Sequence, residues 1–345
     1  MAFHEKIRIG VLRGGPSSEY EISLKTGAEV LKYLPEKYNP VDIFIDKVGV
    51  WHLHGMPKDS HLALRYIDVV FNALHGEYGE DGGVQEILDA HAIPYTGSTR
   101  FASAMAMNKA AAKGILASYG IKTPYYKILR KEQVDSFYDL ARRLHRSFPL
   151  PCVVKPLAKG SSVGVSTAST LDELINALEV GFAIAETLLV EEYIAGREAT
   201  CGVIDNFRNE HFYSLLPIEI KPPKQSSFFD YYAKYSGKSL EICPGNFSRA
   251  ESAKLQELAK KVHSALGLRH YSRSDFIVHP RRGIYFLEVN ALPGLTMGCP
   301  FPKAIQAVGC SFPQFLEHVI VLAFAGNSAL RKYKNVVESL HSDIV

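Results

Sequence analysis

The sequence lacks the features that mark membrane-spanning and disulfide-rich proteins. It has no run of about 18 or more apolar residues, which argues against a transmembrane helix. Its five cysteines are widely spaced, with no Cys-x-x-Cys pair, so we expect neither a disulfide framework nor a structural zinc site. The first residues, MAFHEKIRIGVL, include no signal-peptide hydrophobic region and lead directly into a strand. These absences indicate a cytoplasmic protein without a membrane partner.

An excess of one charge is also missing. Lysine and arginine number 39 against 36 acidic residues, a formal charge of +3, and the basic residues form no long block. Interspersed charge of this kind keeps a protein in solution and does not indicate nucleic acid as a partner. With 345 residues, 47% of them hydrophobic, the chain is long enough for two or three domains with buried cores.

Residues 1–100 alternate short apolar runs with helical segments. Three runs have the character of strands, 7–12, 41–45 and 68–74, and we expect the last two to be buried on both faces. This alternation predicts a doubly wound parallel sheet, in which ligands bind beyond the carboxyl ends of the strands. Two polar loops follow such ends, 13–19 and 75–82. Glu19 is either a first-turn acid favoured by the helix dipole or a carboxylate directed into the crevice.

A further apolar strand, at 151–156, carries Lys155 near its end and precedes the glycine- and serine-rich loop 157–165. Backbone N–H groups in such a loop can turn toward a phosphate while the lysine supplies positive charge. The loop lacks the Gly-Lys-Ser/Thr of a Walker A sequence and continues into another strand, as a hairpin that folds over its ligand would. The alternative is an exposed turn between two strands.

One further segment has the character of a nucleotide-binding site, and another has that of a lid. Glu191 and Glu192 end a buried strand, where acids can accept hydrogen bonds from ribose hydroxyls and the backbone can pair with an adenine edge. Glu198, on the next strand, offers the same chemistry. For all three acids a solvated edge is the alternative. Residues 221–247 form a long aromatic loop without a clear period, which is typical of a lid.

The stretch 271–294 predicts two strands joined by a tight turn. If this hairpin is symmetric about its turn, Asp275 lies opposite Glu288. Arg273 then lies opposite Asn290, and the alternation of side chains along a strand places all four on one face. We expect two apolar residues on that same face, Ile277 and Phe286. The opposite face is expected to pack on a core through Ser274, Phe276, Val278, Tyr285, Leu287 and Val289.

The polar face of this hairpin predicts a metal site. Two carboxylates directly opposite each other repel, so a cation is expected between Asp275 and Glu288. Together with Asn290 they offer only hard oxygen ligands, which suit Mg²⁺ or Mn²⁺ better than zinc. The alternative is a solvated face whose charge is neutralised by Arg273.

The order of these segments resembles that of the D-alanine–D-alanine ligases, a family of ATP-grasp enzymes. Nine pieces carry the resemblance across nearly the whole chain: GGPSSEYEISL, HGEYGEDG, PYTGS, MNKAAAK, VVKPLAKGSSVGVS, VEEYIAGRE, FFDYYAKY, SRSDF and EVNALPG. The resemblance implies an α/β fold, α+β in its ATP-grasp part, in which an N-terminal doubly wound parallel sheet precedes a two-lobed ATP-grasp fold. The implied domains are a substrate-binding domain at 1–100, a central lobe at 101–200 and a C-terminal lobe at 201–345. The last holds the metal site and the lid loop 221–247.

The resemblance also assigns roles to individual residues. Phosphate and nucleotide contacts of ATP would come from Lys109, Lys155, Ser162, Glu191, Tyr193, Ile194, Glu198 and Lys234. Two Mg²⁺ or Mn²⁺ ions would be bound by Asp275, Glu288 and Asn290. The reacting groups would be held by Glu19, Ser161, Tyr235, Arg273 and Gly294. Glu19 would bind the first D-alanine's ammonium group, and Arg273 with the Gly294 N–H would stabilise oxyanion charge.

The implied reaction joins two D-alanines through an acylphosphate, as a step in peptidoglycan synthesis for the cell wall, and the implied assembly is a homodimer. The Lys234-Tyr235 pair resembles that of ligases joining two D-alanines. The sequence departs from the family at Cys299-Pro300, where a Ser-Leu pair usually helps to anchor the second substrate. A thiol is a weaker donor than a hydroxyl, and proline has no N–H.

Two alternatives therefore stand beside dipeptide synthesis. One is another ATP-grasp carboxylate–amine ligase with a different second substrate. The other is a nucleotide-binding regulator without catalysis, against which the retained Arg273, Asp275, Glu288 and Asn290 argue.

Overall fold

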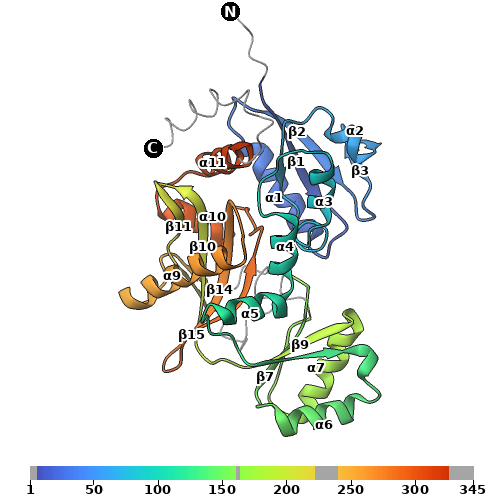
Figure 1. Cartoon of the computed structure of the whole chain (residues 1–345), viewed down its shortest axis with the longest axis vertical. Helices are drawn as coiled ribbons and strands as arrows, with labels where there is room; N and C mark the ends of the chain where they lie inside the picture. Colours follow the sequence, from blue (N-terminus) through green and yellow to red (C-terminus); the bar gives the residue numbers. More distant parts are fainter. Residues whose placement is uncertain (1–5, 161–163, 222–239, 326–345) are drawn as a thin grey trace, which may run out of the picture.

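The computed structural model describes residues 6–160, 164–221 and 240–325, and these contain three sheets (Figure 1). The first sheet has the order β4-β3-β2-β1-β5. Its strands are β1 (Arg8–Gly14), β2 (Asn39–Ile45), β3 (Trp51–Leu53), β4 (Met56–Lys58) and β5 (Val69–Asn72). Strand β1 pairs in parallel with both β2 and β5, which confirms the predicted parallel sheet, while β3 and β4 extend its edge as an antiparallel hairpin. The helices of this region are α1 (Tyr20–Tyr33), α2 (Ser60–Leu64) and α3 (Gly83–Ala90).

The second sheet is antiparallel and has the order β6-β9-β7-β8. Its strands are β6 (Tyr126–Arg130), β7 (Cys152–Pro156), β8 (Ser166–Ala168) and β9 (Thr187–Glu192), and a short 3-10 helix, η1 (Lys131–Gln133), follows β6. Two helices, α6 (Phe137–Ser147) and α7 (Leu171–Ile184), share a core with it, centred on Leu178 and Phe182. Helix α7 begins at a capped N-terminus, because the Thr170 hydroxyl accepts a hydrogen bond from the Glu173 N–H.

The third sheet has the order β13-β12-β10-β14-β15, with β11 paired to β10. Its strands are β10 (Arg197–Phe207), β11 (Glu210–Ser214), β12 (Ile218–Lys221), β13 (Leu240–Ile242), β14 (Tyr271–His279) and β15 (Gly283–Asn290). Helix α9 (Arg249–Ala265) packs on it together with two earlier helices, α4 (Arg100–Met107) and α5 (Lys109–Ser118). The chain segment 100–118 therefore belongs to the core of the third sheet, whereas the domain limits 1–100, 101–200 and 201–345 stay a prediction.

The hairpin β14–β15 has the predicted register at its polar end, where Arg273 pairs with Asn290 and Asp275 with Glu288. A bulge follows between Asp275 and Phe276, so beyond it Phe276 pairs with Phe286. The prediction that Phe286 lies on the polar face is wrong, because the bulge turns its ring into the core against Phe276. Two residues predicted for the core face, Tyr285 and Leu287, pack instead with Ile277 and Ile194.

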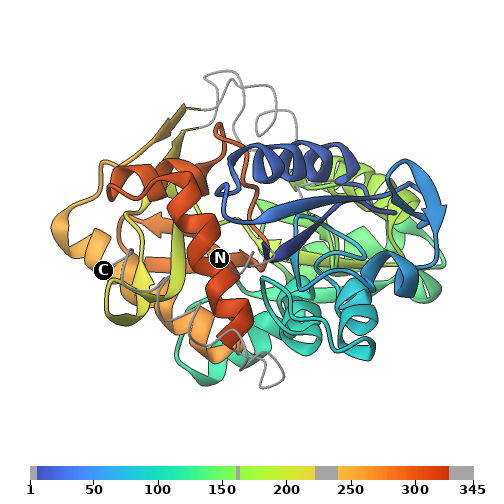
Figure 2. The same cartoon turned by 90° about the horizontal axis from the view of Figure 1, so that it is seen from above.

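The first and third sheets share one hydrophobic core. Helix α11 (Phe312–Ala325) follows α10 (Pro300–Ala307) and lies between the two sheets (Figure 2). Its Phe315 and Val319 are fully buried in the cluster that also contains Phe71 of β5 and Tyr271 of β14. No single helix of the described segments is long and apolar enough to cross a membrane; α10 and α11 reach that composition only as a pair, bent by 102° at their break.

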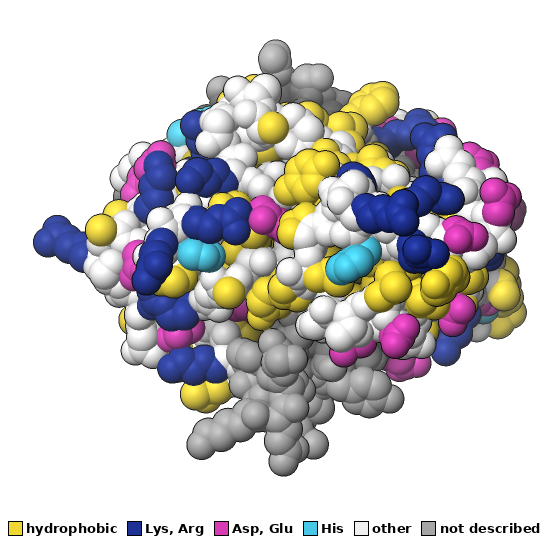
Figure 3. All heavy atoms as spheres, turned by 90° about the horizontal axis from the view of Figure 1, so that it is seen from below, with side chains coloured by type: hydrophobic (Ala, Val, Ile, Leu, Met, Phe, Trp, Pro, Cys, Tyr) yellow, Lys and Arg dark blue, Asp and Glu magenta, His cyan; other side chains and the backbone are white. Residues whose placement is uncertain are grey.

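The surface around the second sheet exposes several large apolar side chains: Tyr125, Ile128, Tyr138, Val180 and Ile184. On the face seen from below, apolar side chains adjoin both basic and acidic ones (Figure 3). This mixture agrees with the interspersed charge of the sequence.

Candidate active site

A cavity of about 610 Å³ is lined by residues of the second and third sheets, of the start of α1 and of the loop that follows β5. Every sequence-predicted site residue that the structure describes lines it: Glu19, Lys109, Lys155, Glu191, Tyr193, Ile194, Glu198, Arg273, Asp275, Glu288, Asn290 and Gly294. Four other predicted residues, Ser161, Ser162, Lys234 and Tyr235, lie outside the described residues, as does most of the predicted lid. Residues from positions 19 to 294 therefore converge on one site.

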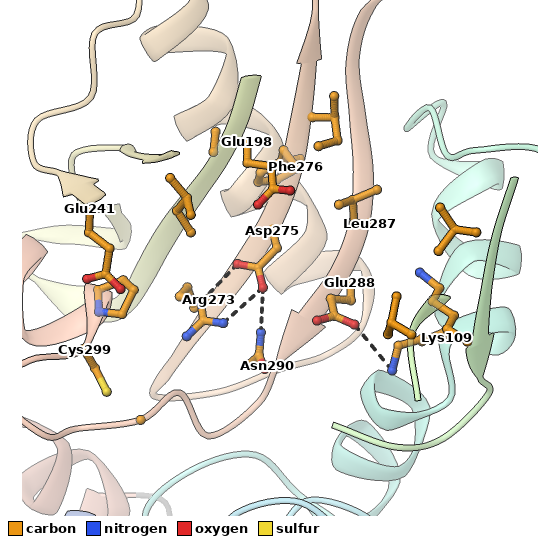
Figure 4. A pocket seen from close by; sticks show the side chains of 18 of the residues that line it. Lys109, Glu198, Glu241, Arg273, Asp275, Phe276, Leu287, Glu288, Asn290 and Cys299 are labelled. Carbon is orange, nitrogen blue, oxygen red and sulfur yellow. Dashed lines mark hydrogen bonds and ion pairs between the residues drawn. The ribbon is translucent and has the colours of Figure 1, made fainter. Parts of the chain in front are cut away.

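Asp275 is the most heavily hydrogen-bonded carboxylate of the cavity (Figure 4). Arg273 donates to both of its oxygens, Nε to Oδ1 and Nη2 to Oδ2, each at 3.0 Å. The Thr200 hydroxyl donates to Oδ1 at 2.5 Å and the Asn290 amide to Oδ2 at 3.1 Å. Burial disfavours the charge of Arg273, but Asp275 outweighs this effect and raises the pKa of the guanidinium above its usual value.

Glu288, opposite Asp275, is paired with a cation from another element. Its Oε2 lies 3.4 Å from Nζ of Lys109, the first residue of α5 (Figure 4). The two carboxylates of the hairpin are thus neutralised separately, by Arg273 and by Lys109. No group of three or more His, Cys, Asp or Glu residues in the described segments is placed to hold a metal ion. The hairpin's donors are two carboxylates and an amide, a hard-oxygen set that fits Mg²⁺ or Mn²⁺.

Lys155 lies at the end of β7, directly before the glycine-rich loop, and its Nζ is 2.8 Å from Oε2 of Glu191. The other oxygen of Glu191 lies 2.9 Å from Nζ of Lys113. Burial alone would raise the pKa of Glu191, but the two lysines hold it below its usual value. The Glu191 carboxylate therefore fixes the ammonium group of Lys155 at the cavity wall and also pairs with Lys113, which is buried outside the lining.

Lys113 was missed as an individual residue, although it ends the MNKAAAK segment. It is fully buried, and burial lowers its pKa to about 8 although Glu191 favours the charged form. The signal that could have revealed it is its spacing, because Lys113 follows Lys109 by one helical turn and so lies on the same face of α5.

Glu19 occupies the N-cap position of α1, yet its side chain makes no capping hydrogen bond. It is buried and faces the cavity, which favours the crevice over the helix-dipole interpretation. The glycine-rich loop packs directly on it, since a Cβ added at Gly160 would lie 2.1 Å from Oε1 of Glu19. The loop and the helix start thereby form one corner of the site.

Two further residues of this corner were missed as individuals, although both belong to the HGEYGEDG segment. Glu80 accepts hydrogen bonds from the N–H groups of Gly76 (3.1 Å) and Leu292 (2.6 Å). Burial and the nearby Glu19 raise its pKa to about 8. His75 is also buried, with Nδ1 3.0 Å from the Leu292 carbonyl oxygen. Both side chains fasten the end of the hairpin segment to the first sheet.

Another wall of the cavity is apolar and suits a flat ring. Ile194, Ile277 and Tyr285 form a small cluster joined by Leu287, and the first two and Leu287 line the cavity. Glu198 of β10 adds a carboxylate beside them (Figure 4). Lys155 and Lys109 line the same cavity as this apolar wall.

Arg273 and Gly294, the two predicted oxyanion donors, both line the cavity. Cys299 lies against this glycine, because a Cβ added there would be 3.1 Å from the Cys299 Sγ. The thiol is also 3.0 Å from the Thr296 hydroxyl oxygen. Cys299 is thus the side chain that stands beside the predicted oxyanion donors.

Comparison with known proteins identifies the family. Models described as the D-ala D-ala ligase N-terminus and C-terminus match residues 8–63, 55–98 and 115–321. A D-alanine–D-alanine ligase of Syntrophobacter fumaroxidans is 38% identical over 326 residues, which cover 92% of this chain and 98% of the relative.

Solved structures agree. The VanG D-Ala:D-Ser ligase of Enterococcus faecalis has a TM-score of 0.79 at 28% identity, over 92% of this chain and 100% of its own. The D-alanine–D-alanine ligase of Bacillus anthracis complexed with ATP has a TM-score of 0.75 at 32% identity, over 94% of this chain and 99% of its own. The chain belongs to the D-alanine–D-alanine ligase family, with the ATP-grasp fold that its sequence predicts.

Proposed function

We propose that this protein is an ATP-dependent ligase that joins two D-alanines to D-alanyl-D-alanine for peptidoglycan synthesis. The observation that carries the proposal is the cavity in which Arg273, the acidic hairpin face, the lysines and Glu19 meet. Relatives that match nearly the whole chain bear the name of this activity, and one related structure is described as an ATP complex.

ATP would lie between the apolar wall and the lysines. Lys109 and Lys155 are positioned to neutralise phosphate oxygens, while Ile194, Ile277 and Leu287 would contact the adenine ring. Asp275, Glu288 and Asn290 would hold Mg²⁺ or Mn²⁺ ions, which when bound would neutralise charge on the transferred phosphoryl group. Lys109 would then be released from Glu288 for the phosphates.

The first step would activate one D-alanine. Glu19 would bind its ammonium group and direct its carboxylate toward the γ-phosphate of ATP, so that an oxygen of the carboxylate attacks phosphorus and ADP leaves. The product is an acylphosphate. The site must exclude water at this stage, because water would hydrolyse the intermediate.

In the second step the amine of another D-alanine would attack the acyl carbon and phosphate would leave. Negative charge develops on the carbonyl oxygen in this step. Arg273, which is fixed by its two hydrogen bonds to Asp275, and the N–H of Gly294 would stabilise it.

The second substrate is the point at which an alternative has specific support. One structural neighbour is described as a D-Ala:D-Ser ligase, and this chain carries Cys299-Pro300 at the acceptor end. A carboxylate–amine ligase with another acceptor, such as D-serine, is therefore the second candidate.

A coupled assay of ADP release separates the candidates. The purified protein is supplied with ATP, Mg²⁺ and D-alanine, L-alanine, D-serine or D-lactate, singly and in pairs with D-alanine, and each product mass is determined. We expect D-alanine alone to give the dipeptide, with little turnover of L-alanine. Product from D-lactate or D-serine mixtures, without dipeptide from D-alanine alone, would replace our assignment with the alternative.

We further infer a cytoplasmic homodimer. All five cysteines are free, which suits a reducing compartment. The dimer is implied by the family resemblance, and sedimentation equilibrium of the purified protein measures it directly.

A further inference from the structure

The acceptor end of the cavity lies beyond Arg273, on the side away from Lys109 (Figure 4). In the proposed function Glu19 binds the first D-alanine, and Lys109 and Lys155 bind the phosphates of ATP. The remaining part of the lining comes from β12, β13 and the start of α10. An amino acid bound here must present its amine to the acyl carbon, so its carboxylate must be held by positive groups on this side.

The backbone at the start of α10 offers little to a carboxylate. The first N–H groups of a helix normally form a site for anions. In α10 the first and third residues are Pro300 and Pro302, which have no N–H, and the N–H of Cys299 already donates to the Thr296 carbonyl at 2.8 Å. Of the first three helical residues, only Phe301 retains a donor.

The side chain at the helix start is a weak donor as well. The thiol of Cys299 is 3.0 Å from the Thr296 hydroxyl, and a thiol donates more weakly than a hydroxyl. Arg273 is close by, but two of its N–H groups are directed to Asp275. Another cation is needed to balance the charge of an amino-acid carboxylate.

Lys303 meets this requirement. It lies one helical turn after Cys299, since its N–H donates to the Cys299 carbonyl, and its side chain lines the same cavity. Its Nζ is 2.7 Å from Oε2 of Glu241 in β13, and the lysine side chain is 37% exposed, so a small substrate can reach it. An ammonium group has three donors, of which Glu241 accepts one.

We propose that Lys303, held in place by Glu241, binds the α-carboxylate of the acceptor amino acid and so selects acceptors that carry this group. This inference rests on the proposed ligase function and names a binding residue that neither the motifs nor the hairpin indicated. Glu241 keeps the ammonium directed into the cavity while leaving its other protons for the substrate.

Competition between two acceptors tests the inference. D-alaninamide has the amine of D-alanine but no carboxylate, so it can act only as acceptor. The enzyme is incubated with ATP, Mg²⁺ and equal concentrations of D-alanine and D-alaninamide, and the ratio of dipeptide to dipeptide amide is measured by mass. We expect the wild type to favour the dipeptide, and Lys303→Met to reduce that ratio about tenfold. Lys303→Arg should retain most of the preference.

Lys260→Met is the matched control, because Lys260 is also 37% exposed and paired with a glutamate, Glu210 at 3.4 Å, but it lies on α9 and does not line the cavity. Its product ratio should equal that of the wild type. An unchanged ratio for Lys303→Met, with dipeptide still formed, overturns the role of Lys303 alone. A wild-type enzyme that forms neither product overturns the proposed function. Thermal melting of each variant identifies a loss of folding, in which case Lys303→Gln replaces Lys303→Met.

Discussion

Four hydrogen bonds converge on the carboxylate of Asp275, two from Arg273 and one each from Thr200 and Asn290. A carboxylate bonded on both oxygens has a fixed orientation, and it fixes the guanidinium in return. Glu288 differs, because its carboxylate meets the flexible side chain of Lys109. Asp275 thus orients Arg273, and we infer that Glu288 is the acid that would exchange its lysine partner for a metal ion.

Glu288→Gln tests this division. The substitution keeps the shape of the side chain but removes the charge, so we expect turnover to fall about 100-fold or more at saturating ATP. The fold should remain cooperative, since this side chain is part of the cavity wall and not of a core. The measurements are ADP release and a thermal melt. Full activity, or a protein that no longer folds, would contradict the metal assignment.

Arg273→Lys is the second test at this scale. Lysine lacks the planar fork that donates to both oxygens of Asp275, so the charge remains but its position is lost. We expect kcat to fall about 100-fold, roughly 3 kcal/mol in the barrier, with a smaller effect on KM for ATP. Steady-state kinetics with D-alanine and ATP measures both. A rate near that of the wild type would place Arg273 outside the reaction centre.

At the scale of elements, the β14–β15 hairpin has one part whose register the sequence predicts and one part that it does not predict. Strand alternation predicts the polar register correctly up to Asp275, because identical rules govern every regular strand. The bulge after Asp275 adds a residue on β15, and no turn residue or glycine announces it. Phe286 and Leu287 therefore exchange faces, and Leu287 reaches the cavity. Contacts between elements, such as Glu191 with Lys113, are equally invisible in a single sequence.

The contact between the glycine-rich loop and α1 gives a prediction at the element scale. A methyl group at Gly160 would displace the Glu19 carboxylate, because the two would be 2.1 Å apart. Glu19 is the end of a flexible side chain, so Gly160→Ala should leave the melting temperature nearly unchanged. We expect KM for the first D-alanine to rise about tenfold while KM for ATP stays close to that of the wild type. Gly114→Ala, on the open face of α5, is the control, and its kinetics should equal those of the wild type.

The whole molecule is held together by contacts that the sequence did not indicate. The family resemblance predicts the succession of sheets, but the packing of α11 against both β5 and β14 depends on tertiary contacts between distant segments. A buried polar cluster beside α11 adds specific links. The His270 N–H donates to Asp205 at 2.5 Å, and the His318 side chain lies 2.7 Å from the Asp205 carbonyl oxygen. Across the boundary of the first sheet, the Gly97 N–H donates to Nδ1 of His270 at 3.1 Å.

The hydrogen bond from Gly97 to His270 makes the free energy of unfolding depend on pH. Nδ1 of His270 accepts the hydrogen bond from Gly97. A proton that binds to Nδ1 therefore breaks this hydrogen bond. Burial lowers the pKa of His270 to about 3, with Arg269, His318 and His263 acting in the same direction and Asp205 opposing. The ordinary value is about 6.5, so between these values the unfolded chain binds a proton that the folded chain does not. The contribution of His270 to the free energy of unfolding is fully present above pH 6.5 and is lost as the pH falls toward 3.

His270→Asn isolates this contribution, because asparagine tolerates the positive φ of 68° and can accept the Gly97 hydrogen bond through its side-chain oxygen. Urea unfolding at pH 7, 6 and 5 measures the slope of stability with pH. Below pH 6 the wild type should lose about 1.4 kcal/mol per pH unit more than the variant does. Parallel slopes would mean that His270 is protonated in the folded protein, and the hydrogen bond from Gly97 would then have to be absent in solution.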